Sequence, residues 1–254
     1  MNTSNQQAVT AGVLIIGNEI LSGRTQDINL NYIARTLGEW GIQVREARVV
    51  PDVEKDVVNA VNEMRSTFNY VFTTGGIGPT HDDITADCIA AAFGVDLVIA
   101  PEIAAVIERR PAPPEVMRSR MRMARIPDGA TLVDNPTGGP QGFRMDNVLV
   151  MAGIPGVMQA MLSSLAGQLD SGPVVRSRSV TAYLGESQLA AALTEIQARY
   201  PDIDLGSYPF FRDDRYGASL VMRGTDPKQL DAILKEVEAA IIAAGETPHD
   251  VRSG

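Results

Sequence analysis

Short apolar runs alternate with amphipathic segments along the first two thirds of the chain. Residues 9–16, 42–50 and 69–73 are rich in β-branched and aromatic side chains, which predicts strands. Residues 27–39 and 55–68 carry apolar side chains three and four positions apart, which predicts helices that pack on a sheet. Strands that alternate with helices run parallel through right-handed crossovers. The sequence therefore predicts an α/β fold, a three-layer αβα domain with a mostly parallel sheet.

Further elements complete this first domain. A strand is predicted at 95–99, a helix that Pro101 opens, a helix over 115–125, a strand at 131–133, a hairpin of 142–145 with 148–151, and a helix from Pro155 to about 169. The helix over 115–125 would align Arg118, Arg122 and Arg125 in one row. A solvated face, a row that meets an anion and a subunit contact all remain open for it.

Ser171, Gly172 and Pro173 mark the predicted boundary between two domains, residues 9–170 and residues 173–245. Beyond it the pattern predicts a strand at 174–183, a helix at 186–200, an antiparallel pair at 206–211 and 217–223, and a helix over 227–244. This order makes a small α+β domain. His249 follows in a polar tail, where no role is expected for it.

The most informative stretch joins the third strand to the next helix. Gly75, Gly76 and Gly78 follow the strand directly, and they let a ligand approach bare backbone N–H groups. Asp82 and Asp83 come next, and neighbouring carboxylates can hold a hard cation. Phosphate together with a divalent metal is the simplest chemistry that satisfies both features. A plain connecting turn is the alternative.

The helix after this loop has predicted start and stop signals. Thr85 suits the N-cap, Asp87 lies in the first turn where the helix dipole favours an anion, and Gly94 ends the helix. His81 precedes the aspartate pair. It can be a metal ligand or an acid–base group, and an exposed loop histidine without a role is the alternative.

A second polar loop follows the first strand. It contains Asn18, and it contains the charged side chains of Glu19, Arg24 and Asp27. Because parallel sheets bind ligands at the carboxyl ends of their strands, these three charged side chains are expected to face the same crevice as Asp82 and Asp83. Capping of the next helix is the alternative, most of all for Asp27.

Composition narrows the classes of function. The net charge of −9 and the pI of about 4.8 argue against a nucleic-acid binder. A single cysteine, Cys88, excludes a disulfide framework and is expected to be buried. No apolar run approaches the ~20 residues of a membrane span, and the polar residues 1–7 resemble no signal peptide. A cytoplasmic protein without membrane contact is expected.

Three motifs together carry a family resemblance. Residues 73–85, Thr-Thr-Gly-Gly-Ile-Gly-Pro-Thr-His-Asp-Asp-Ile-Thr, resemble the signature of the molybdopterin-binding domain, supported by the run from Gly17 to Asn29 and by Ala152 to Gly156. This domain occurs in molybdenum-cofactor biosynthesis proteins, competence/damage-inducible protein A and the N-terminal part of eukaryotic FAD synthases. The resemblance covers residues 9–168. It implies a nucleotide or pterin ligand, with contacts from Asn18, Glu19, Asp27, Thr74, Gly75, Gly76, Gly78, Gly153 and Pro155.

The second domain resembles the KH-like segment of competence proteins, but it lacks a Gly-x-x-Gly clamp, so nucleic-acid binding is not expected. Asn18, His81 and Ala152–Pro155 depart from the competence-protein pattern. The run from His81 to Asp83 and the run from Thr25 to Asp27 look closer to the FAD-synthase branch. The adenylyltransferase and deamidase domains of these two branches are not recognised in the sequence. Synthesis of FAD and deamidation of nicotinamide mononucleotide are therefore not expected.

The resemblance implies three candidate functions. The first is metal-dependent hydrolysis of the pyrophosphate of an adenine dinucleotide such as ADP-ribose or FAD. In this mechanism Asp83 is the main metal ligand or water-activating group, Asp82 supports it, Glu19 completes the carboxylate set, and Mg²⁺, Mn²⁺ or Co²⁺ is the cofactor. The second is molybdopterin binding or adenylylation in cofactor biosynthesis, and the third is a non-catalytic scaffold. A homodimer or higher homo-oligomer is expected.

Overall fold

The computed structural model describes residues 8–212 and 214–254. The polar segment 1–7 and residue 213, which falls between the predicted strands 206–211 and 217–223, lie outside the described residues. The chain divides into two compact units, of which the first ends at Gly172 and the second begins at Pro173.

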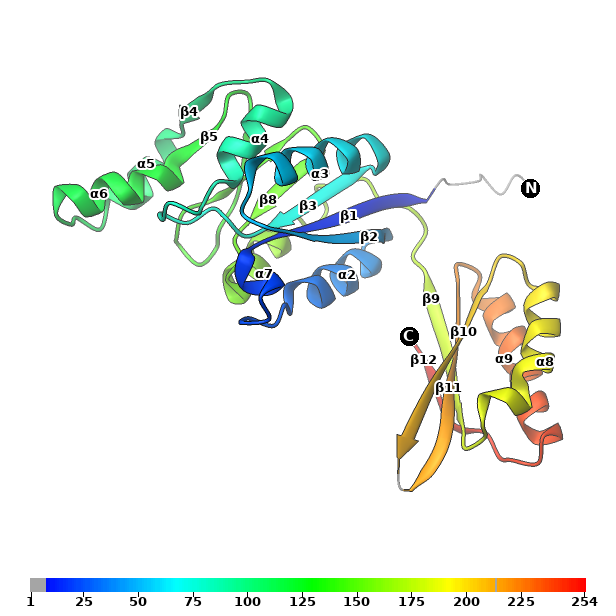
Figure 1. Ribbon diagram of the computed structural model, residues 1–254. Coiled ribbons are helices and arrows are strands. Elements are labelled where there is room, and N and C mark those ends of the chain that lie inside the picture. Colours follow the sequence, from blue (N-terminus) through cyan, green and yellow to red (C-terminus); the bar gives the residue numbers. More distant parts are fainter. Residues whose placement is uncertain (1–7, 213) are drawn as a thin grey trace, which may run out of the picture. The chain divides into compact units, whose positions relative to one another are not determined.

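The first unit contains a six-stranded sheet in the order β2-β1-β3-β8-β7-β6 (Figure 1). The strands β2, β1, β3 and β8 are parallel neighbours, whereas β7 and β6 run antiparallel. Their bounds are β1 Val9–Ile16, β2 Ile42–Val50, β3 Tyr70–Thr74, β6 Thr131–Val133, β7 Gly142–Met145 and β8 Val148–Met151. The predicted mostly parallel sheet is confirmed, and the predicted hairpin is β7 with β8. Asp146 in its turn has φ 53°.

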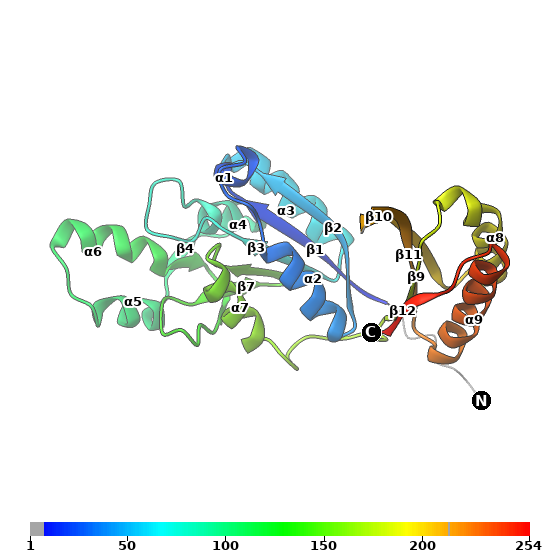
Figure 2. The ribbon, with the colours of Figure 1, turned by 90° about the horizontal axis from the view of Figure 1, so that it is seen from below.

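Helices cover both faces of this sheet, which confirms the three layers. The helices α3 (Glu54–Thr67) and α4 (Thr85–Phe93) pack together on one face (Figure 1). The helices α2 (Asn29–Glu39) and α7 (Pro155–Ser164) pack together on the other (Figure 2). Alternate residues of β1 enter opposite cores, Leu14 with α3 and α4, and Val13 with α2 and α7. This is the pleat of a strand buried on both faces.

A second, two-stranded sheet lies beside α4 (Figure 1). It pairs β4 (Leu97–Ile99) with β5 (Arg125–Pro127), and the intervening chain forms α5 (Pro101–Glu108), α6 (Pro114–Met121) and the 3₁₀ turn η1 (Arg122–Ala124). The predicted single helix over 115–125 is therefore wrong in its last turn, and the row of three arginines does not form. Arg125 belongs to β5, where its guanidinium meets the carboxylate of Asp87 at 2.7 and 3.1 Å. Strand pairing and this bidentate ion pair outweigh the local helical pattern.

Three predicted boundaries are corrected around the strand ends. A short helix, α1 (Asn18–Leu21), replaces part of the predicted loop. Helix α2 begins at Asn29 and not at Asp27, because the Asp27 carboxylate accepts the Leu30 N–H at 2.9 Å from outside the helix. Helix α7 ends at Ser164 and not near residue 169, and the chain then turns through Gly167 at φ 73°.

Thr85 is the first residue of α4 and not its N-cap, which is Ile84. Its hydroxyl donates to the carbonyl of Gly75 at 2.9 Å. Asp87 lies in the first turn and Gly94 ends the helix in the left-handed conformation, as predicted. Thr85 therefore ties the helix start to the preceding loop.

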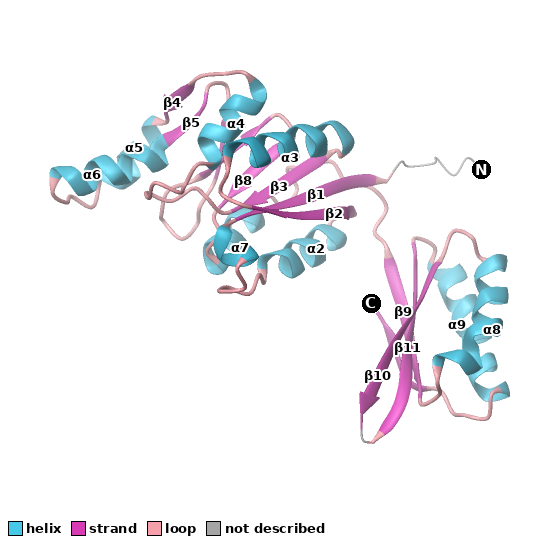
Figure 3. Cartoon of the chain, viewed as in Figure 1, coloured by secondary structure: helices cyan, strands magenta, loops and turns pink. Residues whose placement is uncertain are grey.

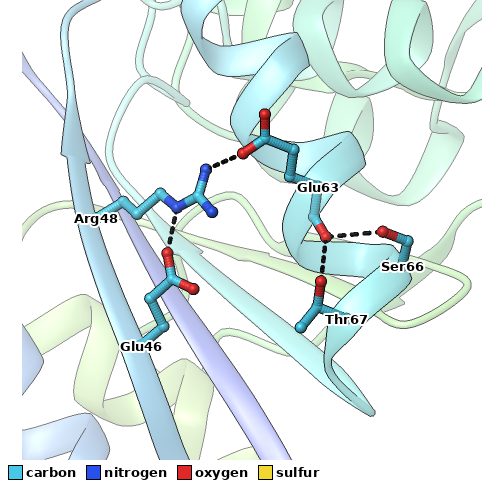
Figure 4. A network of polar contacts seen from close by, with 5 residues as sticks. All are labelled: Glu46, Arg48, Glu63, Ser66 and Thr67. Carbon is cyan, nitrogen blue, oxygen red and sulfur yellow. Dashed lines mark hydrogen bonds and ion pairs between the residues drawn. The ribbon is translucent and has the colours of Figure 1, made fainter.

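The edge strand β2 is joined to α3 by an ion-pair network (Figure 4). Arg48 of β2 donates to Glu46 on the same strand and to Glu63 of α3. These bonds, first that to Glu46 and then that to Glu63, raise the pKa of Arg48 above its ordinary value. The hydroxyls of Ser66 and Thr67 each donate to the Glu63 carbonyl at 2.8 Å, near the end of α3.

The second unit is a βαββαβ arrangement with a four-stranded antiparallel sheet in the order β10-β11-β9-β12. Its elements are β9 Arg176–Ala182, α8 Glu186–Arg199, β10 Asp204–Arg212, β11 Arg215–Gly224, α9 Pro227–Ala243 and β12 His249–Ser253. Both helices cover one face of the sheet (Figure 3) and enclose a core that includes Val180, Leu220 and Ile233.

Strand β12 corrects the prediction of a polar tail. His249 begins this strand, opposite Thr181 of β9, and its ring packs edge-on against Tyr183 with 5.3 Å between centroids. The segment carries no alternating apolar pattern and takes its structure from pairing with β9. Cys88 is fully buried in the first unit, as predicted. Among the described helices, none is long and apolar enough to cross a bilayer.

Candidate functional site

A cavity of about 590 Å³ lies where β1, β3 and β8 end. Parallel α/β sheets bind ligands at this edge. Four segments contribute to its walls, namely the segment after β1 with Glu19 and Thr25 and parts of the loops 75–83, 135–140 and 152–157. The lining residues are Glu19, Thr25, Gly75, Gly76, Ile77, Gly78, Pro79, Asp83, Met123, Asn135, Thr137, Gly139, Pro140, Ala152, Gly153, Ile154, Pro155, Val157 and Met161.

Most of the predicted contact residues meet here. Seven of them line the cavity: Glu19, Gly75, Gly76, Gly78, Asp83, Gly153 and Pro155. Thr74 and Asp27 line a smaller adjoining space of about 70 Å³, which shares Glu19, Gly75, Gly153 and Pro155 with the main cavity. The loops after β1, β3 and β8 therefore converge.

Asn18, Asp82 and His81 line neither space. The backbone N–H of Asn18 donates to the Asp52 carboxylate at 2.8 Å. Asp82 is exposed, and a hydrogen bond from Thr80 lowers the pKa of its carboxyl below the usual range. The His81 side chain is 97% exposed, with Nδ1 3.9 Å from Asp82. The two neighbouring aspartates thus have different surroundings.

Two glycines of the loop after β3 need their lack of a side chain. Gly75 has φ 101°, and a Cβ on it would lie 2.1 Å from the Ile16 carbonyl oxygen. Gly76 has φ 66°, and a Cβ on it would lie 2.2 Å from the Thr85 hydroxyl oxygen. Any larger residue at either position would collide with its neighbour and strain the backbone. The loop keeps its path by backbone approach to β1 and α4.

The same loop carries backbone donors without an acceptor. The N–H of Gly75 donates to Met151 at 3.3 Å, and that of Gly78 to Asp83 at 2.7 Å. The N–H groups of Gly76 and Ile77 find no acceptor among the described residues. Both residues line the cavity, so these amides can serve an anionic ligand.

Asp83 closes the turn that follows. Its Oδ1 accepts the N–H of Gly78, and its Oδ2 accepts the N–H of Thr80 at 2.8 Å. The Thr80 hydroxyl lies 2.5 Å from Asp83 Oδ2 and 2.6 Å from Asp82 Oδ1, and its single proton serves one of them at a time. The Asp83 carboxylate thus holds the glycine loop in place while it lines the cavity.

Glu19 supplies the second carboxylate of the cavity. It lies in the first turn of α1, and its side chain folds back over Gly17, where an added Cβ would meet Oε2 at 2.5 Å. No donor among the described residues engages the Glu19 carboxylate. Glu19 and Asp83 are the only ionisable side chains among the lining residues, so the wall of the cavity is acidic.

Sequence reasoning missed Asn29, which holds the opposite loop. This residue is 4% exposed, and its amide donates to the Gly153 carbonyl at 2.8 Å. Gly153 in turn lies against Gly75, since an added Cβ would be 3.3 Å from the Gly75 Cα. An asparagine near the predicted start of a helix was the available signal. This signal does not identify the hydrogen-bond partner of Asn29, because the loop of Gly153 lies more than a hundred residues away.

Asn135 lies in the loop after β6 and was not among the predicted site residues. Its side chain is 6% exposed, accepts the N–H and hydroxyl of Thr137 at 3.1 and 2.6 Å, and donates to the Pro140 carbonyl at 2.8 Å. Apolar side chains complete the wall, namely Ile77, Met123, Ile154, Val157 and Met161. The cavity therefore has an apolar part beside its carboxylates, as small-molecule sites do.

Positive charge lies on the other side of the glycine loop. A space of about 20 Å³ is lined by Gly76, Gly78 and Asp83 together with Arg122 and Arg125. Arg125 is paired with Asp87. These two guanidinium groups bring positive charge to a space that Asp83 also lines.

The two carboxylates of the cavity, Glu19 and Asp83, suit a cation that takes its other ligands from the phosphates of a bound substrate. Within residues 8–212 and 214–254, no three His, Cys, Asp or Glu side chains gather as a metal site. The hydrogen bonds of Asp83 also occupy much of its carboxylate. Mg²⁺ commonly binds through one or two carboxylates and the phosphate oxygens of a substrate. Glu19 and Asp83 match that mode.

Two family models match the chain. The model described as a probable molybdopterin binding domain matches residues 12–171. The model described as the middle domain of FAD synthase matches residues 174–248. The two matches together span both compact units.

Individual relatives agree with these matches. A protein of Archaeoglobus fulgidus is 30% identical over 197 residues, which cover 78% of this chain and 84% of the relative. A probable FAD synthase of Caenorhabditis briggsae is 28% identical over 262 residues, covering 91% of this chain and 50% of the relative. The crystal structure of the protein CinA from Thermoplasma acidophilum has 32% identity and a TM-score of 0.58, covering 63% of this chain and 98% of that one.

Proposed function

Because the chain belongs to the family of the probable molybdopterin binding domain, we propose that it is a metal-dependent pyrophosphatase that acts on an adenine dinucleotide of the ADP-ribose or FAD type. The ligand occupies the cavity at the carboxyl ends of β1, β3 and β8. Its pyrophosphate meets the glycine loop, and its rings meet the apolar wall.

The observation that carries this proposal is the pairing of free backbone donors with carboxylates in one cavity. The N–H groups of Gly76 and Ile77 find no acceptor among the described residues, and Glu19 and Asp83 line the same space. Backbone amides suit phosphate oxygens, whereas carboxylates repel them. A ligand that uses both needs a cation between its phosphates and the carboxylates.

The negative charge of the cavity also indicates that a phosphate ligand needs a cation. No lysine, arginine or histidine is among its lining residues. A pyrophosphate would therefore meet two negative side chains and no positive one on the cavity side of the loop. Bound Mg²⁺, Mn²⁺ or Co²⁺ would neutralise this repulsion and supply Lewis-acid polarisation of a phosphoryl oxygen.

The protein's own groups then have distinct parts. Asp83 holds the Gly78 loop in place through its bonds to the N–H groups of Gly78 and Thr80, and its carboxylate would help to hold the cation. Glu19, whose carboxylate meets no donor in the described part of the chain, would hold the cation or accept the proton of the attacking water. The amides of Gly76 and Ile77 take the charge that develops on the phosphate oxygens.

The reaction is a balanced hydrolysis. Water attacks one phosphorus of the anhydride, the bridging P–O bond breaks, and the leaving phosphate keeps the bonding electrons. ADP-ribose gives AMP and ribose 5-phosphate, and FAD gives AMP and FMN. The proton released from water passes to a carboxylate or to solvent.

The test is hydrolysis by the wild type and Glu19→Gln, assayed as AMP released with each of the three metals. Glu19→Gln should lose about two to four powers of ten in turnover, equivalent to ~3–5 kcal/mol of transition-state stabilisation. Glu39→Gln, an exposed glutamate at the end of α2, is the matched control and should keep wild-type turnover. Full activity in Glu19→Gln would remove this residue from the mechanism.

A second candidate, binding or adenylylation of molybdopterin, is favoured by the family match over residues 12–171. A pterin ring suits the apolar wall, and the pterin's phosphate suits the loop amides. Tight molybdopterin binding without cleavage of ADP-ribose or FAD would select this function. We further propose that the protein is a homodimer, which light scattering at micromolar concentration would test against a monomeric mass.

A further inference from the structure

A second pocket opens beside the main cavity. It has a volume of about 200 Å³ and is lined by Val106, Ile107, Arg110, Arg120, Met123, Gly138, Gly139 and Pro140. Met123, Gly139 and Pro140 also line the main cavity, so the two spaces lie on either side of this shared wall. A ligand long enough to pass the wall could reach both.

The charges of the two spaces are opposite. The main cavity has Glu19 and Asp83, whereas the second pocket has Arg110 and Arg120 and no acidic lining residue. Neither arginine takes part in an ion pair among the residues that the structure describes. Two arginines without acidic partners in one pocket stand out in a chain of net charge −9.

The arginines are held on a fixed frame. A guanidinium nitrogen (Nη1) of Arg120 donates to the carbonyl of Arg110 at 2.8 Å, which joins the end of α5 to α6. Pro111 and Pro113 lie in the connection and Pro114 opens α6, which restricts the backbone there. A guanidinium has five N–H donors, so Arg120 keeps others for a ligand.

The facing wall is fixed as well. The side chain of Asn135 bonds Thr137 and Pro140, which sets the path of the loop between the two spaces. Gly138 has φ 78°, and its N–H returns to the Asn135 carbonyl at 2.9 Å. The basic pocket is thus preformed, and little ordering is needed when an anion binds.

We infer that this pocket binds a terminal phosphate group, so that the ligands of the adjoining cavity include ones with a phosphomonoester in addition to any bridging pyrophosphate. Arginine pairs with phosphate through parallel N–H···O bonds, and a phosphomonoester carries more charge than a bridging phosphate. Phosphate at this end needs no cation, unlike phosphate beside Glu19 and Asp83. The inference rests on the proposed function only in one respect, because that function identifies the part of the ligand that occupies the main cavity.

Inorganic phosphate tests the pocket without any assumption about catalysis. Calorimetric titration of the intact protein should give saturable binding that weakens at least tenfold in Arg110→Gln and in the double variant Arg110→Gln/Arg120→Gln, and that weakens as salt rises. Arg109→Gln and Arg118→Gln change arginines of the same segment that do not line the pocket, and they should bind as the wild type does. Equal binding in all five proteins would overturn the inference. Arg110 is exposed, and its side chain makes no hydrogen bond or ion pair within residues 8–212 and 214–254, so Arg110→Gln should fold.

A matched pair of nucleotides tests the terminal phosphate itself. ADP-ribose and ADP-ribose 2′-phosphate differ only in one phosphomonoester, and the second should bind the wild type about tenfold more tightly. The double variant should remove this difference and leave the affinity for ADP-ribose within about twofold. Equal affinity of the wild type for both nucleotides would contradict the inference. Absence of hydrolysis would instead defeat the proposed function alone, because both titrations measure binding.

Discussion

The Asp83 carboxylate accepts the N–H of Gly78 at 2.7 Å, five residues back along the same loop. This bond closes the turn that presents Gly76 and Ile77 to the cavity, and Asp83 lines that cavity itself. One side chain thus holds the loop and contributes negative charge to the site. Its neighbour Asp82 is exposed and lies outside the cavity.

The two aspartates are therefore expected to respond differently to substitution. Asp83→Asn replaces one acceptor oxygen by an amide donor that faces the N–H of Thr80, so it should cost about 1 kcal/mol of stability. It should also lower turnover by about two to four powers of ten. Asp82→Asn should lose less than tenfold in turnover and leave stability within about 0.5 kcal/mol. Urea unfolding measures the stability and AMP release measures the turnover. Equal losses of turnover and stability in Asp83→Asn and Asp82→Asn would refute the different roles of the two aspartates.

The approach of Gly153 to Gly75 gives a second prediction. Gly153→Ala places a Cβ 3.3 Å from the Gly75 Cα, so two loops of the cavity must separate by a few tenths of an ångström. Displacements of catalytic loops are costly, and turnover should fall about tenfold or more while stability changes by less than ~1 kcal/mol.

Gly156→Ala is the matched control for this substitution. It lies three residues later in the first turn of α7, and an added Cβ there meets nothing within 4 Å. Because alanine favours helix, Gly156→Ala should keep turnover and gain up to ~1 kcal/mol in stability. Wild-type kinetics in Gly153→Ala would show that the spacing of the two loops does not matter.

Cys88 predicts a pH dependence of stability. Burial, helped by the charges of Glu54 and Asp87, raises the pKa of its thiol to about 12. The folded state therefore disfavours the thiolate, while the unfolded chain ionises near pH ~8.5. The stability that the protonated Cys88 thiol contributes is fully present below that pH. It is lost as the pH rises toward 12, when the free energy of unfolding falls by about 1.4 kcal/mol for each pH unit.

The comparison of wild type with Cys88→Ala isolates this effect from other titrating groups. Between pH 8.5 and 11 the free energy of unfolding should fall more steeply in the wild type than in the variant. The native thiol should also resist a thiol reagent at pH 8 until the protein unfolds, since Cys88 is fully buried. Parallel pH profiles, or rapid labelling of the folded protein, would contradict the account.

The sequence predicted the elements whose signals are local. Strand β1, the β7–β8 hairpin and the Gly94 helix stop follow from apolar runs, a turn pair and a glycine, which need no distant partner. Strand β12 and the position of Arg125 were missed because pairing with β9 in one case, and with β4 and Asp87 in the other, decides them. Tertiary contacts outweighed the local pattern at both places.

The candidate site divides in the same way. Glycines and carboxylates after β1 and β3 were found because parallel strands bring their ends to one edge. Asn29 and Asn135 were missed because they act through hydrogen bonds that the sequence does not show. The Asn29 amide donates to the Gly153 carbonyl, and the Asn135 amide donates to the Pro140 carbonyl. Asp83 was ranked above Asp82 from the sequence but both were placed at the site, since only the turn between Gly78 and Asp83 shows that Asp83 lines the cavity and Asp82 does not.

The most direct test of the central claim is the release of AMP from ADP-ribose and FAD by the wild-type protein, with and without Mg²⁺, Mn²⁺ or Co²⁺. In ¹⁸O-labelled water, one product phosphate should carry the label, because water attacks phosphorus. The account predicts turnover with at least one metal, loss of that turnover with a chelator, and recovery when metal is restored. Failure to cleave either nucleotide with any of the three metals would contradict it.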